Sequence, residues 1–261
     1  MPSLNGGTVW VTGAGSGIGR TCAIAFAAAG GKIALTGRRV APLEETARII
    51  RESGGTAFVV PADVADAETV RAAHAKLVAA LGDPLVLVNS AGGNVRRRHW
   101  ANLESMGVSQ VVDLDLKAMF YCTLAVLPAM RARRDGRIVH IGSQAGVSLQ
   151  TLTGPSYSAA KTAVLAMSAS LNAEEGINGI RSICLSPGEV ETPILDTRPS
   201  PPSQADRALM LRPEDVAEVA LFCACLPQRA CVSELILLPT DDRLVRHAAR
   251  AIEALVAAAE M

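Results

Sequence analysis

The chain has 261 residues and a formal net charge of zero at pH 7; 49% of its residues are hydrophobic but only 3% are aromatic. This balance argues against nucleic acid or an anionic membrane as a partner held by bulk charge. We find no apolar run long enough to span a bilayer and no signal peptide. The six cysteines lack metal-ligand spacing, so we expect reduced thiols, no bound metal and a cytoplasmic location.

The first predicted element is a short buried strand at 9–11, followed by a glycine-rich turn and an alanine-rich helix at 18–29. Gly13, Gly17 and Gly19 lie in the turn. Glycine allows positive φ and close approach of a pyrophosphate, and the helix N-terminus offers free N–H groups. An ordinary tight turn is the alternative, but the strand before it and the helix after it favour dinucleotide binding.

A second strand is predicted at 32–36, and Gly37-Arg38-Arg39 follows it. A fold that binds NAD usually carries an acidic residue at the end of this strand, which would hold the ribose hydroxyls. Arg38 instead suits a 2′-phosphate, and no carboxylate is present to repel it. We therefore predict NADP(H) as the cofactor, with NAD as the alternative because surface arginines are common at strand ends.

Apolar strands continue to alternate with helices along the chain. Further strands are predicted at 56–60, 85–88, 137–141, 180–185 and 234–238, and helices at 42–51, 66–81, 106–134 with an interruption near Pro128, 155–174 and 213–226. Near-continuous apolar strands separated by helices indicate a parallel sheet that is covered on both faces. The predicted fold is α/β: a single doubly wound parallel sheet of Rossmann type with helices on both faces, formed by residues 1–240.

Two segments lie outside this regular alternation. Residues 194–211 contain three prolines among polar residues, so we expect a mobile segment over the strand ends. Residues 241–261 are predicted to form a helical tail that covers a sheet edge or a neighbouring subunit. Its apolar stripe consists of Leu244, Ala248, Ile252, Leu255 and Ala259.

Tyr157 and Lys161 are four residues apart, which places them on one face of a helix. The ordinary pKa of a tyrosine phenol is about 10, and a nearby ammonium group lowers it toward the range of a general acid or base. Ser143 ends the preceding strand and can turn its hydroxyl toward the same place. Each residue alone has a structural alternative: a core aromatic, a solvated charge and a turn residue.

Together these motifs occur in the order typical of the short-chain dehydrogenase/reductase family, which the chain resembles over about residues 6–239. They are the glycine turn, Asn89-Ser90-Ala91-Gly92, Ser143, Tyr157-x-x-x-Lys161 and Pro187-Gly188. The resemblance implies that Tyr157 donates or accepts the proton, that Lys161 lowers its pKa, and that Ser143 polarises the substrate carbonyl. It also implies hydride transfer between a secondary alcohol and a ketone or aldehyde, and a homotetramer or dimer.

The same resemblance implies a set of cofactor contacts. They are Gly13, Ser16, Gly17, Ile18, Gly19, Arg38, Asp63, Val64, Asn89, Ala91, Gly92, Tyr157, Lys161, Pro187, Gly188, Val190 and Thr192. Within this set Asp63 and Val64 would flank the adenine, and Val190 and Thr192 would meet the nicotinamide amide.

The sequence departs from the family pattern at Asp115, which stands where the family usually has a catalytic asparagine. An ionised Asp115 would stabilise the Lys161 cation and oppose its effect on Tyr157, or it would merely accept a hydrogen bond with little effect. Because of this change, a dinucleotide-sensing protein without turnover is the alternative function. The stretch from Ser143 to Tyr157 is also longer than the family pattern, and a glycine pair is replaced at Leu237-Leu238-Pro239-Thr240.

Charged and polar residues near the strand ends leave the substrate open. Two roles are possible for the run Arg96-Arg97-Arg98-His99: it receives an anionic substrate, or it forms a solvated or intersubunit face, which is the commoner role. Glu189 and Gln144 are expected to face the substrate because the family pattern places their neighbours there.

Overall fold

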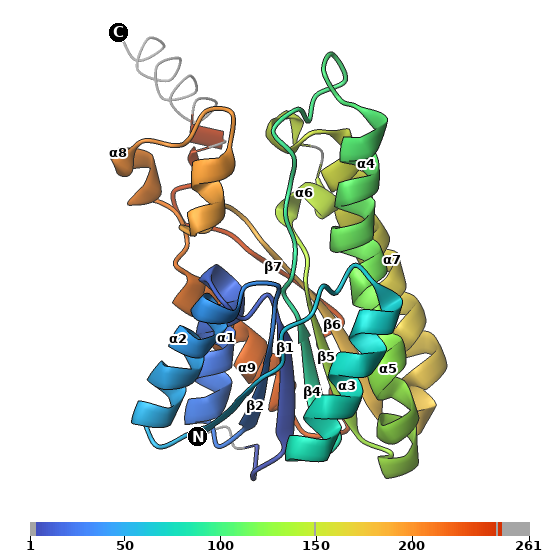
Figure 1. Cartoon of the computed structure of the whole chain (residues 1–261). Helices are drawn as coiled ribbons and strands as arrows, with labels where there is room; N and C mark the ends of the chain where they lie inside the picture. The colour runs from blue at the N-terminus through green and yellow to red at the C-terminus, as the bar shows by residue number, and fades with distance from the viewer. Residues whose placement is uncertain (1–3, 149, 244, 247–261) are drawn as a thin grey trace, which may run out of the picture.

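The structure is a computed structural model of the whole chain that describes residues 4–148, 150–243 and 245–246. In this part, seven parallel strands form one sheet in the order β3-β2-β1-β4-β5-β6-β7 (Figure 1). The strands are β1 Thr8–Thr12, β2 Lys32–Thr36, β3 Thr56–Val59, β4 Pro84–Asn89, β5 Gly136–Ile141, β6 Ile180–Pro187 and β7 Glu234–Leu237. From β1 the chain adds strands on one side as far as β3, and it then continues on the other side from β4 to β7. In such folds ligands bind at this switch point, beyond the carboxyl ends of the strands.

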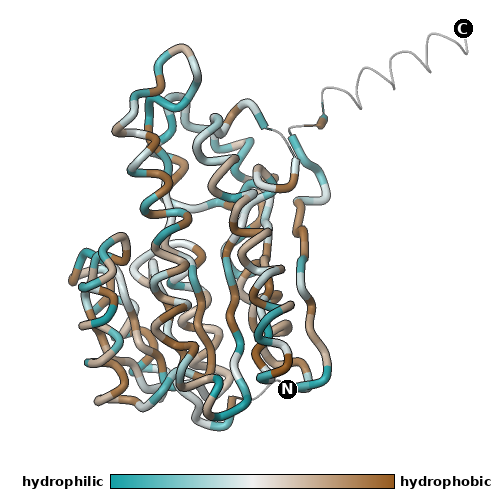
Figure 2. Tube along the Cα trace, turned by 90° about the vertical axis from the view of Figure 1, so that its right-hand side faces the viewer, coloured by the Kyte–Doolittle hydropathy of each residue, from teal (hydrophilic) through white to brown (hydrophobic). Residues whose placement is uncertain are grey.

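Helices cover both faces of the sheet, which confirms the predicted doubly wound Rossmann-type fold. On the left of Figure 1 lie α1 Gly17–Ala28, α2 Val40–Glu52 and α9 Pro213–Ala224; on the right lie α3 Ala67–Leu81, α4 Ser105–Val112, α5 Ala118–Arg133 and α7 Pro155–Glu175. A separate apolar core fills each side of the sheet. Figure 2 shows hydrophobic residues running along the strands, while the helices alternate between hydrophobic and polar positions.

The expected interruption of the long helix near Pro128 is wrong. Pro128 lies inside α5, on its exposed side, where water can satisfy the carbonyl group that the proline leaves without an N–H partner. The helix is instead disturbed at η1 Asp113–Lys117, a π-helical turn between α4 and α5. A π turn inserts an extra residue into the helix and is frequent at functional sites. Here it contains Asp115, which is fully buried.

Several short elements over the strand ends were not predicted. The stretch after Ser143 folds into α6 Gln144–Val147 and the 3-10 turn η2 Thr151–Thr153, which accommodates its extra length. The proline-rich segment contains the 3-10 turn η4 Pro193–Thr197 and the short helix α8 Gln204–Arg207. A further 3-10 turn, η3 Gly176–Asn178, connects α7 to β6.

The helical tail was predicted from residue 241 onward, and its apolar positions Leu244, Ala248, Ile252, Leu255 and Ala259 lie outside the described residues. At its start, the amides of Val245 and Arg246 both donate to the carbonyl oxygen of Asp242, as in a first helical turn. The boundary at residue 240 stays a prediction. No described helix is long and apolar enough to cross a membrane, and all six cysteines are free thiols.

Candidate active site

A cleft of about 340 Å³ lies at the carboxyl edge of the sheet. One end of the cleft is lined by the loops after β1, β2 and β3, and the other by the loops after β4, β5 and β6. Residues from six strand ends therefore share one cavity, as expected for a parallel sheet.

The glycine turn forms the floor of the first end. Gly13 and Gly17 have positive φ angles of 66° and 52°, and a Cβ at Gly13 would lie 2.8 Å from the Ser90 carbonyl oxygen. A Cβ at Gly19 would lie only 2.3 Å from the Gly13 carbonyl oxygen, because α1 packs directly on the turn. The turn therefore requires glycine at these positions, and it presents the N-terminus of α1 to the cleft. This geometry fits a bound pyrophosphate.

Arg38 lies at the same end of the cleft, is exposed, and forms no ion pair within the described part of the chain. Gly37 precedes it at the position of the missing acidic residue. A Cβ at Gly37 would meet nothing closer than Leu43 Cδ2 at 3.5 Å, so the position is not restricted to glycine. The absence of a carboxylate there is therefore a chemical feature of the site and not a steric requirement. Asp63 and Val64 line this end as well.

The structure brings together nearly all of the residues that the family resemblance assigned to the cofactor. Those that line the cleft are Gly13, Ser16, Gly17, Ile18, Gly19, Arg38, Asp63, Val64, Ala91, Gly92, Tyr157, Lys161, Pro187, Gly188, Val190 and Thr192. Asn89 does not line it. Its side chain is buried beneath the cleft, where the amide nitrogen lies 3.2 Å from His140 Nδ1 and 3.5 Å from the Met119 carbonyl oxygen.

Ser143, Tyr157 and Lys161 meet at the second end. Ser143 lies two residues after β5 and caps α6 by accepting a hydrogen bond from the Ala145 amide, and Tyr157 and Lys161 lie one turn apart on α7. The Lys161 ammonium is buried 5.6 Å from the centre of the Tyr157 ring and donates to the Ile141 carbonyl oxygen at 3.1 Å. The predicted catalytic residues thus converge from two separate elements on one wall of the cleft.

Asp115 lies in the same cluster and forms a buried ion pair with Lys161, with Oδ1 3.1 Å from Nζ. Its carboxylate also accepts from the Gly93 amide at 3.2 Å. A Cβ at Gly92 would lie 2.7 Å from Asp115 Oδ1, so glycine at that position gives the carboxylate its space. The π turn explains how an acidic residue in the middle of a long helix reaches the lysine.

The ion pair acts on the pKa values of this cluster. Burial alone would lower the pKa of Lys161, but the Asp115 carboxylate and Tyr157 oppose it and raise that pKa above the ordinary lysine value. The pKa of Tyr157 is raised because the phenol is enclosed by the cleft, and Asp115 raises it further. Lys161 and a hydrogen bond with Ser143 lower it, but they do not reverse the direction.

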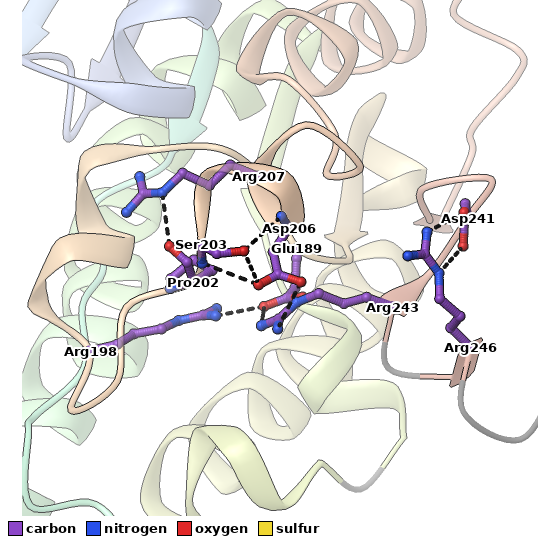
Figure 3. Close-up of polar contacts among 9 residues, drawn as sticks. All are labelled: Glu189, Arg198, Pro202, Ser203, Asp206, Arg207, Asp241, Arg243 and Arg246. Atoms are coloured by element: carbon purple, nitrogen blue, oxygen red, sulfur yellow. Dashed lines mark hydrogen bonds and ion pairs between the residues drawn. The ribbon is translucent and has the colours of Figure 1, made fainter.

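Gln144 and Glu189 both line the cleft, as expected. The Gln144 Oε1 atom is buried and finds no hydrogen-bond partner among the described residues. Glu189 is buried and paired: Arg198 Nη1 lies 2.6 Å from Oε1, and Arg243 donates to the same atom at 2.9 Å. Figure 3 shows the two arginines reaching Glu189 from opposite sides. The role of Arg243, which lies beyond the last strand, was missed and has no local sequence signal.

The run Arg96-Arg97-Arg98-His99 is not a single surface. Arg96, Arg97 and His99 are exposed, and Arg97 forms an ion pair with Glu104. Arg98 is only 4% exposed and lines the cleft. Sequence analysis could not separate Arg98 from its neighbours, because all the arginines of the run lie in one irregular loop without periodicity.

The parallel sheet and the glycine turn at its topological switch point define a Rossmann-type α/β protein. The chain belongs to the short chain dehydrogenase family, whose profile matches residues 7–202. It is 37% identical to galactitol 2-dehydrogenase (L-tagatose-forming) of Cereibacter sphaeroides over 231 residues, which is 85% of this chain and 89% of the relative.

Two solved structures are also similar. A metagenomic short-chain oxidoreductase in complex with NADP has a TM-score of 0.79 at 27% identity, with 92% of this chain and 99% of the other covered. The alcohol dehydrogenase of the archaeon Thermococcus sibiricus, complexed with 5-hydroxy-NADP, has a TM-score of 0.81 at 27% identity, with 91% and 98% covered. The chain is therefore an oxidoreductase of this family.

Proposed function

We propose that this protein is an NADP(H)-dependent oxidoreductase that interconverts a secondary alcohol and a ketone or aldehyde. The observation that carries the proposal is the convergence of Ser143, Tyr157 and Lys161 on the wall of a cleft whose other end is a glycine turn. A proton-transfer group and an anion-binding turn in one cavity are what a nicotinamide-dependent reaction requires.

The residues at the first end of the cleft fit NADP(H). The backbone around Gly17 and Gly19 would hold the pyrophosphate at the N-terminus of α1, and Arg38 would meet the 2′-phosphate. One similar structure is a complex with NADP and the other a complex with 5-hydroxy-NADP, which supports this choice. When bound, the nicotinamide ring supplies or accepts the hydride.

The residues at the second end would move the proton. In alcohol oxidation, the phenolate of Tyr157 accepts the hydroxyl proton of the substrate as the carbonyl group forms; in reduction, the phenol returns it. Ser143 donates a hydrogen bond to the substrate oxygen and steadies its developing charge. Lys161 stabilises the phenolate because its ammonium is buried beside the Tyr157 ring.

The class of substrate rests on this chemistry and on the relatives. The names of two similar proteins specify a galactitol 2-dehydrogenase and an alcohol dehydrogenase, so a hydroxyl-bearing substrate is shared between them. We therefore assign a secondary alcohol, and polyols are the first compounds to test.

The experiment is an assay of nicotinamide absorbance across a panel of polyols, simple secondary alcohols and their carbonyl counterparts, with NADP(H) and NAD(H) in parallel. We expect turnover with at least one alcohol–carbonyl pair and a preference for NADP(H). Tight NADP(H) binding without turnover of any compound would contradict the proposal.

That outcome would favour the second function, a protein that senses the dinucleotide without catalysis. The observation in its favour is the ion pair between Asp115 and Lys161, which opposes the effect of Lys161 on the pKa of Tyr157.

We also propose that the chain associates with copies of itself. Exposed apolar side chains gather on α5 at Phe120 and Leu124, and on α9 and β7 at Phe222 and Ile236. Burying them against a second copy would remove apolar surface from water. Sedimentation at several concentrations tests this, and a monomer at all of them would contradict it.

A further inference from the structure

Arg98 is the most unusual charged residue in the cleft. Its side chain is enclosed, and the only hydrogen bond it donates to described residues runs from Nε to the Val95 carbonyl oxygen, at 2.8 Å. No carboxylate pairs with it in the part of the chain that the structure describes. Its guanidinium therefore borders the cleft with two nitrogen atoms, Nη1 and Nη2, that donate to none of the described residues.

The loop that carries Arg98 is fixed to the start of α7, the helix that carries Tyr157. The side-chain Nδ2 of Asn94 donates to the Thr153 carbonyl oxygen at 2.8 Å. A Cβ at Gly154 would lie 2.1 Å from the Arg98 carbonyl oxygen, so the two backbones are in close contact. The backbone of Arg98 is thereby held against the segment just before α7, the helix that carries the proposed proton-transfer group.

The charges at this end of the cleft do not balance. Its lining contains three cations, Arg98, Lys161 and Arg198, but only two carboxylates, Asp115 and Glu189. Asp115 is paired with Lys161, and Glu189 is paired with Arg198 as well as with Arg243 beyond the lining. The positive charge of Arg98 is the one left uncompensated.

Burying such a charge without a partner costs free energy. Burial lowers the pKa of Arg98, and the nearby like charge of Arg198 lowers it further. A ligand with a negative charge placed between them would offset the cost. A planar guanidinium with free Nη atoms is the donor geometry that carboxylate and phosphate oxygens prefer.

On the basis of the proposed function, we infer that the substrate carries an anionic group, a carboxylate or a phosphate monoester, which Arg98 binds while Tyr157 acts on its hydroxyl or carbonyl group. Arg198, which is paired with Glu189, lines the same cleft and would add a second positive charge to this subsite. The substrate class is then a hydroxy acid or hydroxyalkyl phosphate, or the corresponding oxo compound.

The test measures the binding of matched probes to the protein saturated with NADP⁺, by isothermal titration calorimetry. The saturating cofactor keeps the probes away from the glycine turn. The first set is glucitol, gluconate and glucitol 6-phosphate, which share a six-carbon polyol chain and differ at one end group. The second is 2-butanol and 3-hydroxybutyrate, and the two sets together distinguish a carboxylate from a phosphate and a long from a short substrate.

The variants are Arg98→Met, which keeps the aliphatic stem, and Arg98→Lys, which keeps the charge. Arg97→Gln is the matched control, because Arg97 is the exposed neighbour that pairs with Glu104. We expect the parent and Arg97→Gln to bind an anionic probe about 10- to 100-fold more tightly than its neutral counterpart. Arg98→Met should remove that preference, and Arg98→Lys should retain part of it.

Equal affinity of the parent for neutral and anionic probes, or no measurable binding of any anionic probe, would overturn the inference. So would a preference that survives Arg98→Met. Arg98→Met could instead weaken the binding of neutral and anionic probes equally, or sharply lower the melting temperature and the affinity for NADP⁺. Either result would mean that Arg98 stabilises its loop, and the inference would be wrong.

The same samples separate this inference from the proposed function. An anion preference that depends on Arg98, without turnover of any probe, would support the anion subsite and contradict the proposed oxidoreductase function. The opposite result is turnover in which neutral and anionic alcohols have equal kcat/KM values, both in the parent and in Arg98→Met. It would support the proposed oxidoreductase function and contradict the anion subsite.

Discussion

The two ends of the cleft are built in different ways. At the proposed cofactor end, the backbone determines the shape: a Cβ at Gly13 or Gly19 would collide with a neighbouring carbonyl oxygen, and Gly17 has a positive φ angle. At the substrate end, charged side chains converge from distant segments, as Arg198 and Arg243 do on Glu189. The first end is determined by local sequence, whereas the second depends on tertiary contacts and, in the proposed function, binds the substrate.

The difference also predicts how each end responds to mutation. A change in the glycine turn alters a backbone shape and should affect every ligand of that end. A change in one charged residue at the substrate end leaves other charges unpaired, because these residues form ion pairs in which two or three side chains contact one another.

Tyr157→Phe should have the largest effect. The ring is kept, so the protein should fold and bind NADP(H) normally, but the group that moves the proton is lost. We expect a fall in kcat of about 10²- to 10⁴-fold or more. Steady-state kinetics and a cofactor titration measure the two effects. The matched control is Tyr121→Phe on α5, the only other tyrosine in the sequence, and it should stay active. Near-normal turnover of Tyr157→Phe would place the chemistry elsewhere.

The cofactor preference should be decided by Gly37 and Arg38 at the other end. The double variant Gly37→Asp, Arg38→Ala should weaken NADP(H) binding by about 1.5–3 kcal/mol, because a charged hydrogen bond is lost, and should favour NAD(H). An aspartate fits at residue 37 because its Cβ would make only ordinary contacts. Direct titration of both cofactors measures the change, with Arg39→Ala as the control. A parent that already binds NAD(H) more tightly would contradict the assignment.

Glu189→Gln tests the substrate end alone. Losing the carboxylate leaves Arg198 and Arg243 without their shared partner, so the free energy of unfolding should fall by about 1–2 kcal/mol. This is less than for a fully buried pair, since Arg243 is partly exposed and solvent screens its charge. Denaturant titration measures it, and Glu191→Gln is the control. Equal stability of Glu189→Gln and the parent would show that the network does not hold this end together.

The same pair of proteins gives a pH dependence with a defined sign. Burial raises the pKa of Glu189, but the hydrogen bonds from Arg243 and Arg198 outweigh it, so the pKa in the folded state lies below the ordinary value of 4.5. A group whose folded pKa is lowered contributes its stability above the unfolded pKa and loses it as the pH falls through the folded pKa. The stability gap between parent and Glu189→Gln should therefore shrink only in acid. A gap that is constant with pH would contradict this account.

Features that depend on local sequence could be predicted, and features that depend on tertiary contacts could not. The strands and most helices could be predicted from apolar runs, and the glycine turn and the Tyr157–Lys161 spacing from local motifs. The π turn at Asp113–Lys117 could not, because no residue in it breaks a helix; Pro128, which does break helices in other settings, sits on an exposed side where its cost is small. The position of Arg98 could not be predicted either, since its burial depends on contact with Gly154, which lies far along the chain.

Asp115→Asn should have the smallest effect, and it concerns the link between Lys161 and Tyr157. Removing the carboxylate removes one of the causes that raise the pKa of Tyr157. The pH profile of kcat/KM for alcohol oxidation should then shift toward neutral pH, with a gain of roughly tenfold at most on its acid side. Asp113→Asn, which alters the exposed pair with Lys117, is the control. Superimposable profiles for parent and Asp115→Asn would contradict the proposed effect, and activity only in the variant would favour a sensing function for the parent.

The central claim is that this cleft transfers a hydride between an alcohol carbon and a nicotinamide while Tyr157 takes the proton. The most direct test uses the best alcohol of the panel with deuterium on its carbinol carbon, and NADP⁺ in ordinary water. Mass spectrometry of the reduced nicotinamide should show one deuterium per molecule formed by the parent and by Tyr121→Phe, and almost no product from Tyr157→Phe. Reduced nicotinamide without deuterium, or none formed with any panel alcohol, would contradict the claim.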